Sequence, residues 1–440
     1  MAVNAITKNY NRSLKMENSI KKKLILIGGG GRGNSYTKIG KDLGKFELVA
    51  VAEPIKCRRE YIAKLHGIPE NMCFESWEPL LELGKIADAA VIATMDRDHY
   101  APAMKAIDCG YDLLLEKPVS PDLSECEEIE AAAKAKGVNV LVCHVLRYTP
   151  FFRALKKLID DGKVGRIMNI DHIEGVGNVH QSHSFVRGNW GNSVRSSFML
   201  LQKSCHDLDI LQWLIGKECK RVQSFGHLSH FNERNAPADA PERCFDGCPH
   251  LESCPYSAKK LYIERKNDGN WFRSSLTKHL DVVGDDVAME ALKDSPYGKC
   301  VYKLDNDVVD HQTVNMEFED DIIVTFTMSA FNLGGRRIRI MGTEGELIAD
   351  AGSPIITYNN LLTQTTEQIN IDDAIASDSI VSGHGGGDSG IMCALYDLLE
   401  GDADAGMLSN ISISVKNHRI VFAAEKSRHE GRIVELCELD

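Results

Sequence analysis

The sequence has no long apolar run, no concentration of basic charge and few aromatic residues, which make up 7% of its 440 positions. A membrane-spanning helix needs roughly 18 uninterrupted apolar residues, and no stretch of this chain reaches that length. The first 22 residues are polar and mixed in charge, without the apolar core of a signal peptide. A formal net charge of −12 repels polyanions. We therefore expect a cytoplasmic protein with no nucleic-acid or membrane partner.

The composition is that of a globular protein, with 43% hydrophobic and 26% charged residues. The length predicts more than one core, and we expect two domains. Thirteen cysteines, an odd number scattered along the chain, favour reduced thiols over a disulfide framework. The polar first segment, residues 1–22, is expected to be a flexible extension outside the fold.

Short apolar runs alternate with amphipathic segments over residues 23–148. Continuous apolar strands separated by helices predict a parallel sheet that is covered on both faces, the doubly wound α/β class. The expected strands are Leu24–Ile27, Leu48–Ala52, Ala89–Ala93, Leu113–Leu115 and Asn139–Val142, and the expected helices are 36–43, 58–65, 99–107 and 123–135.

The pattern changes in residues 149–440. Several strands follow one another without helices between them, which predicts an α+β domain with a mainly antiparallel, open sheet. Two stretches, 232–271 and 367–388, fit neither pattern and are expected to be long loops. The expected helices are 151–161, 204–215 and a closing helix at about 412–430, and the expected strands are 167–174, 314–318, 322–328 and 337–341.

A glycine-rich turn follows the first strand directly. Gly28, Gly30 and Gly33 have the G-x-G-x-x-G spacing: the first permits a tight turn, the second lets a pyrophosphate approach the backbone, and the third lets the next helix pack closely. Twenty residues later, Glu53 ends the second strand, where a carboxylate can accept hydrogen bonds from ribose hydroxyls. This predicts an NAD site, and Arg58 leaves NADP open as an alternative.

Together with segments before and after it, the triplet Glu116-Lys117-Pro118 resembles one family strongly, the Gfo/Idh/MocA oxidoreductases. The matching segments, in order, are GGGGRG, AEP, ATMDRDHYAPAMKAIDCGYDLLLEKP, RYTPFFRALKKLIDDGKVGRI, HDLD and MGTEGEL, which span about residues 23–347. The resemblance implies a Rossmann domain followed by a substrate-binding and oligomerisation domain. The cofactor-binding residues that we expect on this basis are Gly28, Gly30, Gly31, Arg32, Gly33, Glu53, Thr94, His99, Glu116 and Lys117.

Oxidation of an alcohol by NAD needs a base for the hydroxyl proton. Lys117 follows a parallel strand, at the sheet edge where ligands bind, and the resemblance implies that it is catalytic. His206 and Asp209 are expected on one helix face with Gln202 one turn earlier. Imidazole titrates near neutrality, so we expect His206 to be the general base and Asp209 to orient it or contact substrate. A buried structural His-Asp pair is the alternative.

The substrate side departs from the commoner family pattern. Many members have an aspartate where this chain has Gln202, and an amide can hydrogen-bond a sugar hydroxyl but cannot exchange protons as a carboxylate does. Lys203 adds a cation for an acidic substrate group, or is a surface lysine. The resemblance predicts a sugar-like substrate, and the expected substrate-binding residues are Arg147, Tyr148, Arg187, Trp190, Gln202, Lys203 and His311.

Three cysteines lie within eleven residues, Cys244, Cys248 and Cys254, and Cys300 could complete a set of four. Four thiolates suit structural zinc or an iron–sulfur cluster, although this spacing is neither a standard zinc knuckle nor a common ferredoxin run. Reduced structural cysteines or a disulfide are the alternatives. A metal here would stabilise the long loop and take no part in hydride transfer.

The sequence as a whole predicts an NAD-dependent dehydrogenase that acts on a hydroxyl or keto group of a sugar, inositol or glycoside. A glycoside-cleaving enzyme that uses bound NAD for transient oxidation and elimination is an alternative within the family resemblance. A regulator that senses NAD without chemistry is the alternative from another class. The family likeness and an open sheet edge predict a homodimer or homotetramer.

Overall fold

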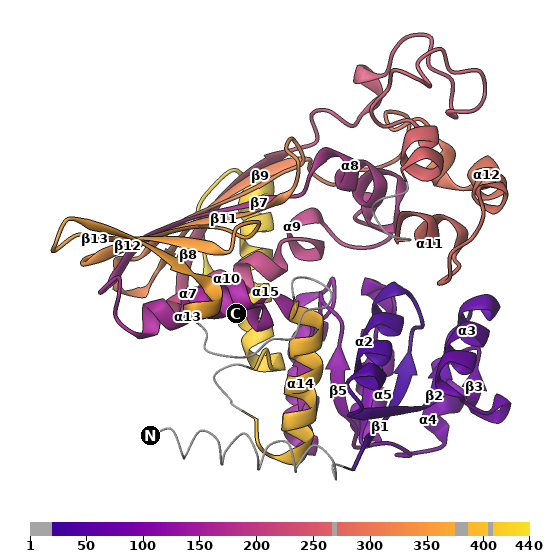
Figure 1. Cartoon of the computed structure of the whole chain (residues 1–440), viewed down its shortest axis with the longest axis horizontal. Helices are drawn as coiled ribbons and strands as arrows, with labels where there is room; N and C mark the ends of the chain where they lie inside the picture. The colour runs from indigo at the N-terminus through magenta and orange to yellow at the C-terminus, as the bar shows by residue number, and fades with distance from the viewer. Residues whose placement is uncertain (1–19, 266–270, 375–385, 404–407) are drawn as a thin grey trace.

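A computed structural model describes residues 20–265, 271–374, 386–403 and 408–440. Most of the predicted extension and the central part of the unassigned stretch 367–388 lie outside these ranges. Figure 1 shows two sheets, each with its own helices, and a separate segment that projects beyond the second sheet. No helix among the residues described is long and apolar enough to cross a membrane.

The first sheet has six parallel strands in the order β3-β2-β1-β4-β5-β6, which confirms the predicted doubly wound class. The sequence pattern missed β3 and α4, which have two and six residues and are too short to show a period. The strands are β1 Lys22–Ile27, β2 Phe46–Ala52, β3 Cys73–Phe74, β4 Ala89–Ile92, β5 Asp112–Leu115 and β6 Val140–Val142. The helices are α2 Gly31–Asp42, α3 Lys56–His66, α4 Trp77–Glu82, α5 Tyr100–Asp108 and α6 Leu123–Lys136, with short turns η1 Glu70–Met72, η2 Asp96–Asp98 and η3 Val145–Tyr148.

Local residue chemistry sets where the helices of this domain begin and end. The Asp122 carboxylate accepts a hydrogen bond from the Ser124 amide at 2.9 Å, which satisfies a free N–H at the start of α6. Gly137 ends that helix at φ +66°, a left-handed conformation that glycine adopts without a steric penalty. The strands between the helices are buried on both faces, because helices cover both sides of the sheet.

The second sheet has nine strands in the order β14-β13-β12-β11-β7-β10-β9-β8-β15. Among the described strands of this second sheet, only the β10–β7 pair is parallel. The predicted α+β domain with a mainly antiparallel sheet is therefore confirmed. β14 lies partly in the stretch expected to be a loop, because its exposed polar sequence TTEQIN carries no alternation. The strands are β7 Ile167–Gly175, β8 Cys219–His227, β9 His311–Phe318, β10 Ile323–Ser329, β11 Gly335–Gly342, β12 Gly345–Asp350, β13 Ile355–Asn360, β14 Thr365–Asn370 and β15 Val434–Glu435.

Helices α7, α10 and α15 pack on one face of this sheet, and alternate strand residues form the core between them. α15 joins the two domains, because Val415 near its start packs in the first domain while Val421 packs in the second. α14 returns to the first domain and buries Met392 there. The helical elements are α7 Pro150–Asp160, α8 Asn178–His180, η4 Gln181–Arg187, η5 Asn189–Gly191, α9 Met199–Gln202, α10 Cys205–Ile215, η9 Glu319–Asp321, α13 Ile371–Ala374, α14 Gly387–Glu400, α15 Ile411–Glu430 and η11 Leu436–Leu439.

The segment between β8 and β9 forms the projecting part of Figure 1. It is not a plain loop, because Tyr262, Phe272 and Leu292 bury themselves in a small core of its own. Its described elements are η6 Glu233–Asn235, η7 Lys259–Glu264, α11 Trp271–Thr277, α12 Asp285–Asp294 and η8 Pro296–Gly298.

Candidate functional site

The glycine loop, residues 28–33, lies between β1 and α2. Gly28 has φ +91°, and a Cβ atom there would lie 2.5 Å from the Ala93 carbonyl oxygen. A Cβ at Gly33 would lie 2.2 Å from the Gly28 oxygen, so the close approach of α2 requires glycine. At Gly30 a Cβ would meet only Arg58, at 3.9 Å, and at Gly31 nothing within 4 Å. The loop is therefore open above the first turn of α2, which fits a pyrophosphate.

Glu53 follows β2 beside this loop and is 4% exposed. Its carboxylate accepts hydrogen bonds from the Gly29 amide at 2.6 Å and from the Ile55 amide at 2.8 Å. Each carboxylate oxygen has a second lone pair, so the group remains able to accept from ribose hydroxyls. Arg58, the residue that left NADP open, donates to the Lys278 carbonyl at 2.9 Å.

Arg32 of α2 and Glu116, which directly follows β5, bond to each other, 2.9 Å apart. Arg32 also forms a bidentate pair with Asp388 of α14, at 2.8 and 2.9 Å, and Tyr36 donates to Glu116 at 2.7 Å. Burial raises the pKa of the Glu116 carboxyl, but the charges of Arg32 and Lys117 and the hydrogen bonds outweigh it, so the pKa is lowered. The carboxylate is thus held ionised beside Lys117.

Thr94 and His99 occupy the loop after β4. The buried His99 ring contacts the Pro118 oxygen through Nδ1 at 2.7 Å and the Thr94 oxygen through Nε2 at 3.3 Å. The Thr94 hydroxyl donates to the Asp98 carbonyl at 2.9 Å. The loop after β4 is thereby connected to the chain that follows Lys117.

Lys117 links the two domains. It lies two residues beyond β5, and its Nζ donates to the main-chain oxygen of Gln202 at 2.6 Å. Gln202 is the last residue of α9, and α10 begins at Cys205, so the predicted single helix face is interrupted between Gln202 and His206. The buried side-chain oxygen of Gln202 has no hydrogen-bond partner among the residues described.

His206 lies in the first turn of α10 and contacts His144, with ring centroids 5.8 Å apart. His144 in turn contacts His418 of α15, at 6.0 Å. His144 is fully buried, and neither of its ring nitrogens has a partner in the described part of the chain. Burial lowers the pKa of His144 to about 4; Asp209 opposes the shift, and Lys117 adds to it. A buried, uncharged imidazole therefore contacts the ring of His206.

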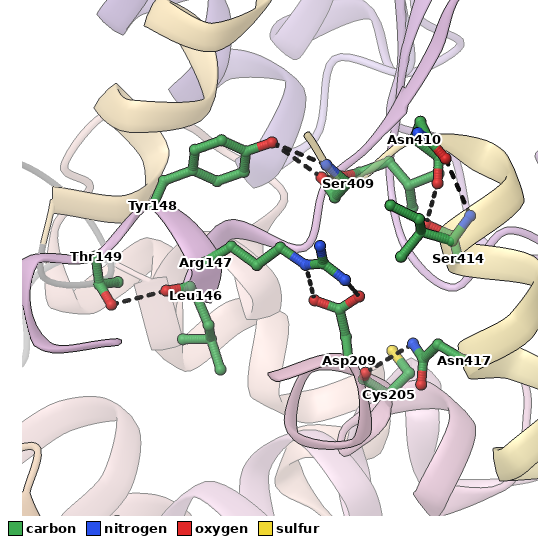
Figure 2. Close-up of polar contacts among 12 residues, drawn as sticks. Leu146, Arg147, Tyr148, Thr149, Cys205, Asp209, Ser409, Asn410, Ser414 and Asn417 are labelled. Carbon is green, nitrogen blue, oxygen red and sulfur yellow. Dashed lines mark hydrogen bonds and ion pairs between the residues drawn. The ribbon is translucent and has the colours of Figure 1, made fainter. Parts of the chain in front are cut away.

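Asp209 pairs with Arg147, and Figure 2 shows the two side chains facing each other. Both contacts, Nε–Oδ2 and Nη2–Oδ1, measure 2.6 Å, and the side chains are 1% and 0% exposed. The Tyr148 hydroxyl lies 3.2 Å from the Ser409 hydroxyl, as the same figure shows. Three predicted site residues thus bond to other protein groups in this structure: Arg147, Tyr148 and Asp209.

Lys203 belongs to a partly buried series of ion pairs that includes Asp207 of α10. Its Nζ lies 3.0 Å from Glu174, Glu174 lies 2.8 Å from Arg336, and Arg336 pairs with Asp207 at 2.7 Å. Burial lowers the pKa of His180 well below its ordinary value, and Lys203 lowers it further. The cation predicted for an acidic substrate group is therefore already paired with a carboxylate.

The remaining predicted pocket residues lie in three different places. Trp190 donates to Asp96 of the first domain at 3.4 Å, close to Ser196 and Ser197, which donate to the same carboxylate. His311 pairs with Asp310 at 2.7 Å and is 43% exposed. Arg187 is 2% exposed and lines a cavity in the segment between β8 and β9. Each of these three residues thus bonds to another protein group in this structure.

The four predicted metal ligands line this same cavity, whose volume is about 200 Å³. Cys244 is buried and the other three are partly exposed, and all four are free thiols. Across the part of the chain that the structure describes, no three His, Cys, Asp or Glu side chains stand ready to hold a single metal ion.

Sequence reasoning missed two members of the site, His144 and Asp388. His144 follows β6 by two residues, at the same carboxyl edge as Lys117, and that position was the available signal. Asp388 had no such signal, because it reaches Arg32 from more than 350 positions away.

The fold and this site define a two-domain oxidoreductase with a dinucleotide-binding front half. A family model described as "Oxidoreductase family, NAD-binding Rossmann fold" matches residues 22–144, and one described as "Oxidoreductase family, C-terminal alpha/beta domain" matches residues 156–436. The chain therefore belongs to the Gfo/Idh/MocA oxidoreductase family, which confirms the resemblance drawn from its motifs.

Named relatives agree with this assignment. The protein YteT of Bacillus subtilis strain 168, named as an oxidoreductase, is 24% identical over 80% of this chain and 83% of its own. The scyllo-inositol 2-dehydrogenase (NAD(+)) of the same strain is 28% identical over 41% of this chain and 50% of its own. A 2,7-anhydro-N-acetylneuraminate hydratase of Mediterraneibacter gnavus is 28% identical over 33% and 38%. The match thus spans half or less of these last two proteins.

A solved structure supports the fold alone. An inositol dehydrogenase homolog complexed with NAD+ from Azotobacter vinelandii superposes with a TM-score of 0.68 at 17% identity, covering 94% of this chain and 97% of that one.

Proposed function

We propose that the chain is a cytoplasmic NAD-dependent dehydrogenase that interconverts a hydroxyl and a keto group on a sugar, inositol or glycoside. The observation that carries the proposal is the contact between Lys117 Nζ and the Gln202 oxygen, 2.6 Å, where the front half meets the back half four residues before His206. A proton-transfer pair drawn from both domains, next to an open glycine loop, is what alcohol oxidation by NAD needs.

The cofactor's place follows from the glycine loop. NAD supplies a hydride acceptor or donor when bound. Gly30 and Gly31 offer backbone amides at the start of α2 to its pyrophosphate, and Glu53 accepts from the ribose hydroxyls. A carboxylate there repels a 2′-phosphate, so NAD is preferred to NADP.

The substrate's place follows from the residues across the domain boundary. His206 accepts the hydroxyl proton in the oxidising direction, and the Lys117 ammonium holds the same oxygen as it becomes a carbonyl. The Gln202 side-chain oxygen, buried and without a partner among the described residues, is suited to accept from a second hydroxyl. A polyol gives such a site several hydroxyls to use, which favours sugars and inositols over simple alcohols.

The experiment is a substrate panel. Purified protein is incubated with NAD and, separately, NADP in the presence of inositols, aldoses, sugar acids and glycosides, while nicotinamide absorbance and products are followed. We expect NADH formation with a polyol and little activity with NADP. Absence of any net redox change with every polyol, while products still form, would reject the dehydrogenase.

That last outcome would favour a second candidate, transient oxidation followed by elimination or hydration. This second candidate is supported by the relative named as a hydratase, which matches a third of this chain. In such an enzyme His206 and Lys117 would exchange protons in the same way, but the hydride would return to the substrate. Retention of tightly bound NAD through purification and deuterium wash-in from solvent at a carbon next to the oxidised centre would identify it.

We also propose that the protein is a homodimer or homotetramer that uses the outer face of the second sheet. Ile173 on β7, Ile323 on β10, Ile348 on β12 and Phe225 on β8 are 42%, 42%, 41% and 56% exposed. Apolar side chains that alternate outward on several strands mark an interface. Light scattering of the native protein and of Ile348→Glu tests this: a monomeric mass for the native chain would reject it.

A further inference from the structure

Four cysteines that the proposed dehydrogenase does not use surround one cavity of about 200 Å³. Cys244, Cys248 and Cys254 come from one loop, and Cys300 comes from a turn 46 positions further along the chain. They lie in the segment between β8 and β9 that projects beyond the second sheet in Figure 1. Four soft ligands therefore converge on one space from two separate stretches of chain.

Backbone hydrogen bonds hold the two stretches together. The Cys244 amide donates to the Gly298 oxygen at 2.9 Å, and the Cys300 amide donates to the Glu242 oxygen at 2.8 Å. An isolated antiparallel bridge pairs the residues next to these cysteines. The main chain thus holds the stretches of Cys244 and Cys300 side by side.

Two groups in the cavity wall can stabilise a negative charge on the sulfur of Cys244. The Ala258 amide donates to Cys244 Sγ at 3.5 Å, and Arg187 Nη2 approaches the same sulfur at 3.9 Å. Two backbone oxygens fix the guanidinium through Nε and Nη2, each at 2.9 Å. A buried cation beside sulfur favours the thiolate, which is the form that ligates metal.

The arrangement of the thiols favours a cluster over one ion. A single zinc ion holds each sulfur at about 2.3 Å and so draws the four sulfurs into mutual contact. No three potential ligands in the described ranges are arranged to hold a single ion, yet all four cysteines line one cavity. In an iron–sulfur cluster, iron and sulfide fill the space between thiolates that stand further apart.

We propose that Cys244, Cys248, Cys254 and Cys300 ligate a [4Fe–4S] cluster whose charge Arg187 partly compensates. Insertion of a preassembled cluster replaces four S–H bonds with four Fe–S bonds, releases four protons and changes no oxidation state. The centre is structural, because it connects Arg187 at the end of η4 to the segment that bears α11 and α12. The proposal does not rest on the dehydrogenase activity.

The test measures metal content. The full chain is purified without oxygen and reconstituted with equal amounts of ferrous and ferric iron and with sulfide, and iron, acid-labile sulfide and zinc are determined per chain. We expect about four iron and four sulfide, a broad visible absorption, and a paramagnetic signal after reduction. Cys254→Ser and Cys300→Ser should each lose more than half of the iron, whereas Cys437→Ser, an exposed thiol elsewhere, should keep it.

Three results would overturn the proposal: about one zinc and no sulfide per native chain, disulfides among these four cysteines, or equal iron in the native chain and the four-serine variant. Circular dichroism and NAD-binding titration show whether a variant has folded. If the variants do not fold, thiol alkylation of the native chain decides, since the four cysteines should be protected until a chelator removes the iron.

Discussion

The two sides of the proposed active site are built in opposite ways. The cofactor side comes from one continuous stretch, β1 to β2, and depends on what its glycines lack: a Cβ at Gly33 would lie 2.2 Å from a backbone oxygen. The substrate side gathers Lys117, His144 and the α10 residues His206 and Asp209 from three separate segments, and depends on charged or titratable side chains that are buried or partly buried. The first side is specified by local pattern and the second by the fold.

This difference predicts two kinds of response to mutation. Changes in the glycine loop should act through steric clash and appear in cofactor affinity. Changes across the domain boundary should act through charge and appear in turnover, stability or pH dependence. If a glycine-loop variant changed turnover without changing cofactor affinity, or a domain-boundary variant changed cofactor affinity alone, the two sides would not differ in this way.

The largest effect is expected for Lys117→Ala. Removal of the amine that reaches the second domain should lower kcat by about 10²–10⁴, the usual contribution of a positioned proton-transfer group. NAD affinity, measured by fluorescence titration, should fall by a much smaller factor than kcat, although Lys117 is also an expected cofactor contact. The matched control is Lys293→Ala, whose side chain is 65% exposed, and kcat should be unaffected. A loss of less than tenfold in Lys117→Ala would contradict the assigned role.

Asp209→Asn is expected to have the next largest effect, on stability. The substitution leaves the Arg147 guanidinium buried without its counter-charge, which should cost about 3–5 kcal/mol in the free energy of unfolding. Asp305→Asn breaks an exposed pair with Arg195, 53% and 66% exposed, and should cost less than about 1 kcal/mol. Urea unfolding of both variants measures the contrast, and equal costs would show that burial of the first pair has no influence.

Gly33→Ala should raise the Kd for NAD about 100-fold, equivalent to about 2.7 kcal/mol. Alanine favours a helix over glycine, so any loss comes from the clash between its Cβ and the Gly28 oxygen. Gly352→Ala is the control, because Gly352 lies outside the cofactor loop and its Cβ would meet only the Asp350 side chain, at 3.3 Å. Calorimetric titration compares them, and an equal Kd for NAD in the two variants would contradict the structural reason.

The same difference explains what the sequence could predict. The parallel sheet, the glycine loop and Glu53 follow from periodicity and spacing within about 30 residues, and the structure has them in those positions. The long closing helix could be predicted equally well: the sequence indicates a helix at about 412–430, and α15 spans Ile411–Glu430. Local rules suffice wherever an element's partners are close in sequence.

Residues whose neighbours are distant could not be placed in this way. The sequence predicts Arg187 as a substrate-binding residue. The structure places its guanidinium beside Cys244, because the segment between β8 and β9 folds back onto η4. Trp190 bonds to Asp96 of the first domain, and His311 pairs with Asp310. Their sequence context carries no information on which chain segment passes beside them, because only tertiary packing decides it.

The smallest expected effect is a change in pH dependence on the substrate side. Burial lowers the pKa of His144 to about 4, below about 6.5 in an unfolded chain. The unfolded state therefore binds more protons between these values, so the stability that His144 contributes is present above pH 6.5 and is lost as the pH falls toward 4. From pH 7.5 to 5 this single histidine should account for about 2 kcal/mol of lost stability.

His144→Asn should remove that part of the acid sensitivity, because the variant has no imidazole for the unfolded chain to protonate. His429→Gln is the matched control, since its side chain is 65% exposed and its loss should leave the pH dependence nearly unchanged. Urea unfolding at pH 5 and at pH 7.5 gives the difference for each protein. If His144→Asn lost as much stability between these two pH values as the native chain, the uncharged, buried state of this ring would be refuted, and with it the electrostatic character of the substrate side.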